Sequence, residues 1–268
     1  MKKELITRTI TGLALVIIIG ISIILGGILF WLTCLLLSTL LYKEFINLYK
    51  DKKSFGFFFS TGIIGIIYYL GIYFNIHYIL QISLLLILIY GAYRVITKYP
   101  AYTYKNIKTT LMGFLYCYVF LSSLYMLRVE DNGLYWILFI LLVSVFGDVG
   151  AYLVGKAIGK RKIAPVLSPG KTLEGLLGGL AFATIVGVIF GVIALQFHFL
   201  LAIALSIAIV MVGLMGDLFE SHLKREVNIK DTGSTLPGHG GFLDRFDAII
   251  FISGFIYLLL SIFYRGVN

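Results

Sequence analysis

Long apolar segments separated by short polar stretches make up most of this sequence. Runs of about 18–24 apolar residues match the length that a helix needs to cross a bilayer. Nine such runs occur, near residues 9–26, 28–45, 55–74, 78–97, 109–127, 133–155, 173–196, 199–219 and 243–264. The first two meet at Gly26 and could also form one bent unit. Strands of a membrane barrel are shorter and alternate, so the pattern predicts an all-α polytopic integral membrane protein with about nine transmembrane helices.

The overall composition supports the membrane interpretation. Of the 268 residues, 60% are hydrophobic and 13% are charged, and the mean hydropathy is +0.99. A soluble chain of this length would need more polar surface. The basic N-terminus lacks a small-residue cleavage pattern, which favours a first span over a removed signal peptide. Cys34 and Cys117 lie in separate apolar runs, which predicts buried side chains rather than a disulfide or a metal site.

Basic residues alternate with the predicted spans. If the N-terminus is cytosolic, nine spans place all but two of the 22 Lys and Arg residues on the inner side, the exceptions being Arg128 and Arg265. This bias predicts a cytosolic N-terminus. The net charge of +9 is then mainly a topology signal that also attracts anionic lipid head groups, so nucleic-acid binding is not needed to explain it.

Acidic residues are concentrated late in the chain, where eight of the 13 Asp and Glu residues lie within 148–247. The stretches VFGDVGAYLVGK and LMGDLFESHLKR each place a Gly-Asp pair near the inner end of an apolar run. A charge at mid-membrane costs about 2.5–3.5 kcal/mol, so such acids usually face a functional cavity. Alternatively, Asp148 and Asp217 lie at the interface and pair with nearby basic residues. On a helix, Asp217, Ser221 and Arg225 would share one face.

The segment SHLKREVNIKDTGSTLPGHGGFLDRFD, residues 221–247, carries eight charged residues and two histidines in 27 positions. Asp244 and Asp247 are three apart at a predicted helix start. Clustered carboxylates suit Mg²⁺, which takes one or two of them from a protein and completes its shell with water and phosphate. The alternative is that Asp244 is a first-turn acid that favours the helix dipole.

The PGHGG stretch before these acids predicts a loop that approaches an anion closely. Gly238, Gly240 and Gly241 permit backbone conformations closed to other residues, and backbone N–H groups ahead of a helix can contact phosphate. His239 could donate to a phosphate oxygen or carry a proton, or it could simply cap the loop.

A second inner stretch, SPGKTLEG, resembles the end of a P-loop without matching it. The required glycine five residues before Gly170 is Pro165, and no strand is predicted ahead of it. What remains is Ser168, Lys171 and Thr172 in a predicted tight turn, a combination suited to phosphate contacts.

Together these residues carry a family resemblance. The segment 221–247 closely resembles the signature of phosphatidate cytidylyltransferases, also called CDP-diacylglycerol synthases, which reads S-x-[apolar]-K-R-x4-K-D and then P-G-H-G-G-x-x-D-R-x-D. The matching positions are Ser221, Lys224, Arg225, Lys230, Asp231, Pro237, Gly238, His239, Gly240, Gly241, Asp244, Arg245 and Asp247. The resemblance covers roughly residues 145–250. One departure is Leu173, where the family commonly has an aromatic residue.

The resemblance implies an enzyme that converts CTP and phosphatidate into CDP-diacylglycerol and pyrophosphate with Mg²⁺. It implies catalytic roles for Lys224, Arg225, His239, Asp244 and Arg245. It implies substrate binding by Ser168, Lys171, Thr172, Ser221, Lys230, Gly238, Gly240 and Gly241. It implies metal ligation by Asp217, Asp244 and Asp247, with Asp148 as a further candidate and room for a second cation.

The expected organisation follows. No linker is rich in Pro or Ser, so we expect one membrane domain over 1–268, in which residues 1–130 form a lipid-embedded scaffold that could contact a second copy in a homodimer. Residues 131–268 are expected to form the catalytic part, and the inner membrane of a bacterium, with the site facing the cytosol, is the expected location.

Two other classes of function stay open on the sequence. A transporter or flippase for an anionic solute would use buried acids as ion sites, but it would spread charges over several spans. A related enzyme, such as a polyprenol kinase or an ether-lipid cytidylyltransferase, would use CTP on another lipid.

Overall fold

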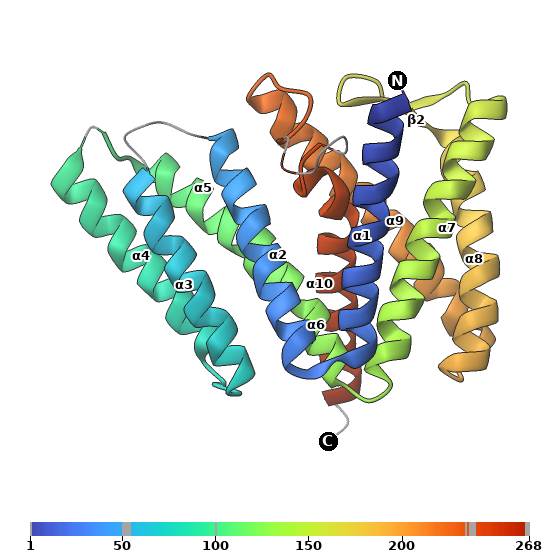
Figure 1. Ribbon diagram of the computed structural model, residues 1–268, viewed down its shortest axis with the longest axis horizontal. Helices are drawn as coiled ribbons and strands as arrows, with labels where there is room; N and C mark the ends of the chain where they lie inside the picture. The colour runs from blue at the N-terminus through green and yellow to red at the C-terminus, as the bar shows by residue number, and fades with distance from the viewer. Residues whose placement is uncertain (1, 50–54, 100, 234, 236–239, 266–268) are drawn as a thin grey trace. The chain divides into compact units, whose positions relative to one another are not determined.

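A computed structural model describes residues 2–49, 55–99, 101–233, 235 and 240–265. Its elements are α1 (Lys2–Leu25), α2 (Gly27–Leu48), α3 (Phe55–Tyr73), α4 (Ile79–Lys98), α5 (Tyr104–Phe114), the π-helical turn η1 (Leu115–Phe120), α6 (Leu121–Val129), α7 (Gly133–Ile158), β1 (Lys162–Ala164), β2 (Ser168–Thr172), α8 (Leu173–Ala194), α9 (Phe199–Glu226) and α10 (Leu243–Arg265) (Figure 1). Because α5, η1 and α6 run on without a break, every predicted apolar run coincides with one helical segment.

Seven helical segments of the described chain are long and apolar enough to cross a membrane. They are Gly27–Leu48, Ile79–Lys98, Tyr104–Val129, Gly133–Ile158, Leu173–Ala194, Phe199–Glu226 and Leu243–Phe263. Thr11–Leu25 and Phe59–Tyr73 are shorter apolar helices. The helical, polytopic membrane class predicted from the sequence is confirmed.

The chain divides into two compact units. The first contains Met1–Tyr125 and Asp231–Leu243, and the second contains Met126–Lys230 and Asp244–Asn268. We describe each unit by itself.

Aromatic side chains hold α2 in the first unit. The Tyr42 and Tyr118 rings lie 5.2 Å apart, and Phe45 meets Tyr116 edge-on at 6.4 Å. Ser38 and the Tyr69 hydroxyl share a buried hydrogen bond of 2.6 Å. Aromatic pairs of this kind add about 0.5–1.5 kcal/mol each beyond burial, so α2 is firmly seated against α3 and η1.

The second unit is a bundle of α7, α8, α9 and α10 around an apolar core. Phe139, Ile140, Val143, Ile209 and Ile256 are buried in this core. The helices α7 and α8 approach closely at glycines: a β-carbon on residue 150 of α7 would lie 2.7 Å from the carbonyl oxygen of Gly178 on α8. Small residues at such positions allow the close backbone approach typical of membrane helices.

The connection between α7 and α8 is a short β-hairpin rather than the tight turn expected at 168–172. The strands β1 and β2 are antiparallel, pairing Lys162 with Thr172. The Thr172 hydroxyl then accepts a hydrogen bond from the Gly175 N–H at 3.1 Å and so caps α8. The pairing satisfies backbone groups that lie beyond the ends of both helices, which apolar periodicity alone does not reveal.

The two cysteines, Cys34 and Cys117, are both free and buried, as predicted.

Candidate active site

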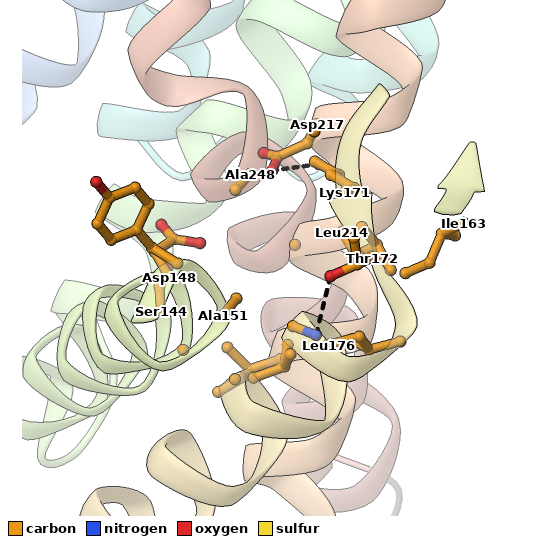
Figure 2. A pocket seen from close by; sticks show the side chains of 18 of the residues that line it. Ser144, Asp148, Ala151, Ile163, Lys171, Thr172, Leu176, Leu214, Asp217 and Ala248 are labelled. Carbon is orange, nitrogen blue, oxygen red and sulfur yellow. Dashed lines mark hydrogen bonds and ion pairs between the residues drawn. The ribbon is translucent and has the colours of Figure 1, made fainter. Parts of the chain in front are cut away.

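A cavity of about 200 Å³ opens within the second unit between α7, α8, α9, α10 and β2. Figure 2 shows its lining, in which Asp148, Lys171, Thr172 and Asp217 are the labelled groups with charge or hydrogen-bonding capacity besides Ser144. Much of the remaining lining is apolar. The cavity therefore combines charged side chains with an apolar wall inside a membrane bundle.

Lys171 and Asp217 form an ion pair across this cavity. The lysine Nζ lies 2.6 Å from Asp217 Oδ2, although 46 positions separate the two residues in sequence (Figure 2). Asp247 is within side-chain hydrogen-bonding reach of Asp217, and Asp148 interacts electrostatically with both Asp217 and Lys171. Two of the four acids predicted from the sequence as metal ligands, Asp148 and Asp217, thus interact with Lys171, and a third, Asp247, lies beside Asp217.

Glycine explains why the acids of α9 and α10 meet. A β-carbon at Gly216 would lie 2.6 Å from the Asp247 carbonyl oxygen and 3.1 Å from the Ala248 Cα. Only a residue without a side chain permits this approach of α9 to α10 without displacing the backbone. On α7, Gly147 likewise packs close to α8 and α9, and the next residue, Asp148, lines the cavity. In both Gly-Asp pairs the glycine therefore allows close helix packing beside the acid.

Lys224 holds a second group of acids. Its Nζ lies 2.6 Å from Glu220 Oε2 and 2.9 Å from Asp244 Oδ1. Glu220 is 1% exposed, and it is also in electrostatic range of Asp247, so the two groups of charges adjoin. Removing one partner of such a buried pair typically costs about 3–5 kcal/mol because the other charge stays uncompensated.

The sequence interpretation missed Glu220. It lies between Asp217 and Lys224 on α9, at the i, i+4 spacing that places an acid and a lysine on one helix face. That spacing was the available signal. Glu174 was missed as well: its carboxylate accepts hydrogen bonds from the backbone N–H groups of Lys160 and Arg161, which fastens the start of the hairpin.

The other predicted residues of the second unit are more dispersed. Ser168 begins β2, and Thr172 is buried as the cap of α8. Arg225 is exposed and donates to the Ile229 carbonyl at 3.1 Å, and the unbroken helix α9 keeps it on the predicted face with Asp217 and Ser221. Ser221 is half-buried, whereas Lys230 and Arg245 are exposed.

The predicted glycine loop is described only in part. Gly240 has a φ of +85°, which favours glycine, and Gly241 is buried in the first unit. Gly238 and His239 lie outside the described residues.

The acids around Lys171 fit a hard divalent cation by their chemistry. No three His, Cys, Asp or Glu side chains in the described parts of the chain are arranged as a ready-made metal cage. Mg²⁺ does not require one, because it is commonly bound through one or two carboxylates together with substrate phosphates. The facing carboxylates of Asp217 and Asp247 supply that number.

Comparison with known proteins shows which family the chain is similar to. The model of the cytidylyltransferase family matches residues 6–263. The chain is 34% identical over 269 residues to a phosphatidate cytidylyltransferase of Staphylococcus saprophyticus, covering 94% of this chain and 98% of the relative. It is 34% identical over 264 residues to that of Helicobacter pylori strain J99, covering 97% and 94%. It is 37% identical over 190 residues to that of Bacillus subtilis strain 168, covering 69% of each chain.

The fold and the site define a polytopic membrane protein with a charged intramembrane cavity. The chain belongs to the cytidylyltransferase family, and the resemblance inferred from residues 221–247 is confirmed over nearly the whole chain.

Proposed function

We propose that this protein is a phosphatidate cytidylyltransferase, which transfers a cytidylyl group from CTP to phosphatidate and forms CDP-diacylglycerol and pyrophosphate. The observation that carries the proposal is the cavity of the second unit, where Lys171, Asp148 and Asp217 share a space with an apolar wall. Ile209 lies eight residues before Asp217 on α9, so the apolar lining extends about two helical turns, or ~12 Å, from the charges. A phosphate monoester with acyl chains has this division of polar and apolar parts.

The reaction needs positioning and charge neutralisation more than covalent help from the protein. A phosphate oxygen of phosphatidate attacks the α-phosphorus of CTP, and the bond from that phosphorus to the bridging oxygen of pyrophosphate breaks, the electron pair leaving with pyrophosphate. Lys171 and Lys224 would hold phosphate groups. Ser168 and Arg225 remain proposed phosphate contacts, and Arg245 a proposed partner of the acids.

Asp217 and Asp247 would hold Mg²⁺, and Asp244 and Asp148 remain proposed further ligands, including for a second cation. When bound there, Mg²⁺ supplies neutralisation of the charge on the triphosphate. Lys171 pairs with Asp217 and Lys224 pairs with Asp244, which compensates these two carboxylates within the bundle.

The cellular placement is part of the proposal. The distribution of Lys and Arg supports a cytosolic N-terminus, with the site on the cytosolic side of a bacterial inner membrane. All cavity-lining residues lie within 144–252, which supports a catalytic role for 131–268 and a scaffold role for 1–130. A homodimer stays a prediction.

The test is conversion of labelled CTP and phosphatidate by the purified protein in detergent with Mg²⁺. We expect CDP-diacylglycerol and pyrophosphate from the parent. Losses of about 10²–10³-fold are expected for Asp217→Asn and Asp244→Asn, the range seen when one electrostatic group of an active site is removed. Asp131→Asn, an exposed acid in the α6–α7 connection, is the matched control and should retain activity.

Product identity separates the alternatives. A CTP-dependent lipid kinase would release CDP rather than pyrophosphate. Absence of any product across several phosphatidate species and divalent metals would contradict the proposal.

A further inference from the structure

We infer that Glu44 of α2 is a positioning residue that fastens both ends of the loop leading into the signature acids of α10. Glu44 belongs to no motif singled out in the sequence, and almost 200 positions separate it from that loop. The inference concerns the first unit alone, since residues 231–243 belong to it. Its catalytic consequence rests on the proposed function.

The Glu44 carboxylate makes two contacts that point to this role. Its Oε2 accepts a hydrogen bond of 2.9 Å from the Leu243 N–H, and its Oε1 accepts one of 2.5 Å from the Thr235 hydroxyl. Leu243 is the first residue of α10, directly before Asp244. One side chain thus binds the loop on either side of residues 236–239, and it satisfies an N–H group that the helix itself leaves unpaired.

Burial and close packing make the arrangement specific. Glu44 is 3% exposed, and a buried carboxylate is tolerated only when it is well hydrogen-bonded. A β-carbon at Gly241 would lie 2.6 Å from Glu44 Oε2, and one at Gly233 would lie 3.4 Å from Oε1. The loop glycines therefore have a second reason for being small: they let the backbone fold around this carboxylate.

The rest of α2 gives the carboxylate a rigid base. Phe45, the next residue, is fully buried and packs against Tyr116 and beneath Gly113. The part of α2 that carries Glu44 is therefore packed into the core of the first unit. Because Asp244 follows Leu243 directly, a shift of Leu243 displaces the acid proposed to act in cytidylyl transfer.

The decisive comparison is between Glu44→Leu and Glu44→Gln. Leucine has an apolar side chain of similar size that accepts no hydrogen bond. Glutamine keeps one oxygen for the Leu243 N–H, and its amide can donate to the Thr235 oxygen. A positioning role predicts that Glu44→Leu lowers kcat/KM for CTP by about 10–100-fold, the range for residues that orient active-site ligands, and that Glu44→Gln restores most of it. Mere space filling predicts that leucine is tolerated at least as well as glutamine.

Ser38→Ala is the matched control. Ser38 lies on the same helix, is fully buried and loses one hydrogen bond, to Tyr69, without touching the loop. We expect Ser38→Ala to keep the parent kcat/KM, and the Glu44→Leu effect to fall on kcat with the KM for phosphatidate unchanged. A Glu44→Leu enzyme as active as the parent, or a loss that simply follows the unfolded fraction in a melting experiment, would overturn the inference.

Amide hydrogen exchange gives a readout that does not depend on activity. Glu44→Leu should speed exchange at Leu243 and its neighbours, Glu44→Gln should do so less, and Ser38→Ala should leave it unchanged. Unchanged exchange in Glu44→Leu would refute the anchoring. A parent that makes no product would count against the proposed function, whereas the exchange result would still decide the role of Glu44.

Discussion

At the scale of single residues, the site is built from charges that compensate one another. Lys171 is paired with Asp217, and Lys224 bridges Glu220 and Asp244. An isolated charge within a bilayer is expensive, so under the proposed function a substrate phosphate or a metal would compete with a partner that the protein already supplies. This competition is a physical reason for a lysine and a carboxylate to share one cavity: each keeps the other tolerable until the substrate arrives.

The first prediction at this scale concerns Lys171. We expect Lys171→Met to lower kcat/KM by about 10²–10³-fold, because it removes a cation facing the phosphates and leaves the acids of the cavity without their partner. Lys171→Arg should restore little, since a planar guanidinium does not replace a compact ammonium group. The measurement is steady-state conversion of CTP and phosphatidate. Lys98→Met, an exposed lysine at the end of α4, serves as control, and near-parental activity of Lys171→Met would contradict the assignment.

At the scale of elements, glycines decide how closely the helices approach and therefore where the acids meet. Gly216 brings α9 against the first turns of α10, so that Asp217 and Asp247 face each other. The hairpin β1–β2 brings Lys171 to the same place, and the Thr172 cap joins that hairpin to α8. The helix α9 contributes Asp217, α10 contributes Asp247 and the hairpin contributes Lys171, so none of these elements forms the site alone.

The element-scale prediction compares two glycines of α9. Gly216→Ala places a methyl group against the Asp247 backbone, whereas Gly213→Ala meets chiefly the tip of the Ile252 side chain at 3.2 Å. The added methyl group should lower the free energy of unfolding of each variant by at most about 1–3 kcal/mol. Only Gly216→Ala should lose activity strongly, by about 10²-fold for a shift near 1 Å. Melting temperatures and kcat/KM measured together test this, and equal activities of the two variants would show that the close approach is not required.

At the scale of the whole molecule, the bilayer governs which surfaces are apolar. Many large apolar side chains are exposed on the described helices, among them Ile18, Leu36, Leu85 and Ile185. Lipid rather than water suits such surfaces. Seven helices of the described chain are long and apolar enough to span, where about nine were predicted, and the orientation prediction rests on the distribution of basic residues.

The orientation prediction uses single cysteines in two loops. Asp131→Cys lies in the α6–α7 connection and Lys105→Cys at the start of α5, and both positions are exposed. With a cytosolic N-terminus, a membrane-impermeant maleimide should label Asp131→Cys in right-side-out vesicles and Lys105→Cys only in inverted ones. The parent, whose two cysteines are buried, should stay unlabelled in both preparations. The reverse labelling pattern would require the opposite orientation.

The local features of the protein were determined by its sequence. Runs of apolar residues located every helical segment, because membrane-spanning length and hydropathy are properties of neighbouring residues, but polar ends such as Lys2 and Glu226 extend the helices by up to seven positions. The signature in residues 221–247 identified the family, because its chemistry is written in fixed spacing. The roles assigned to its residues remain predictions.

Only the tertiary structure decided which charges are partners. Lys171 pairs with Asp217, 46 positions away, and Glu44 accepts a hydrogen bond from Leu243, 199 positions away. Glu220 is buried and pairs with Lys224 one helical turn later. Such pairs depend on how closely helices pack and on which donors their ends leave unsatisfied, and neither quantity has a period along the chain. For that reason the contacts of Glu44 had no signal in the sequence, whereas Glu220 had only its i, i+4 spacing to Lys224 as a signal.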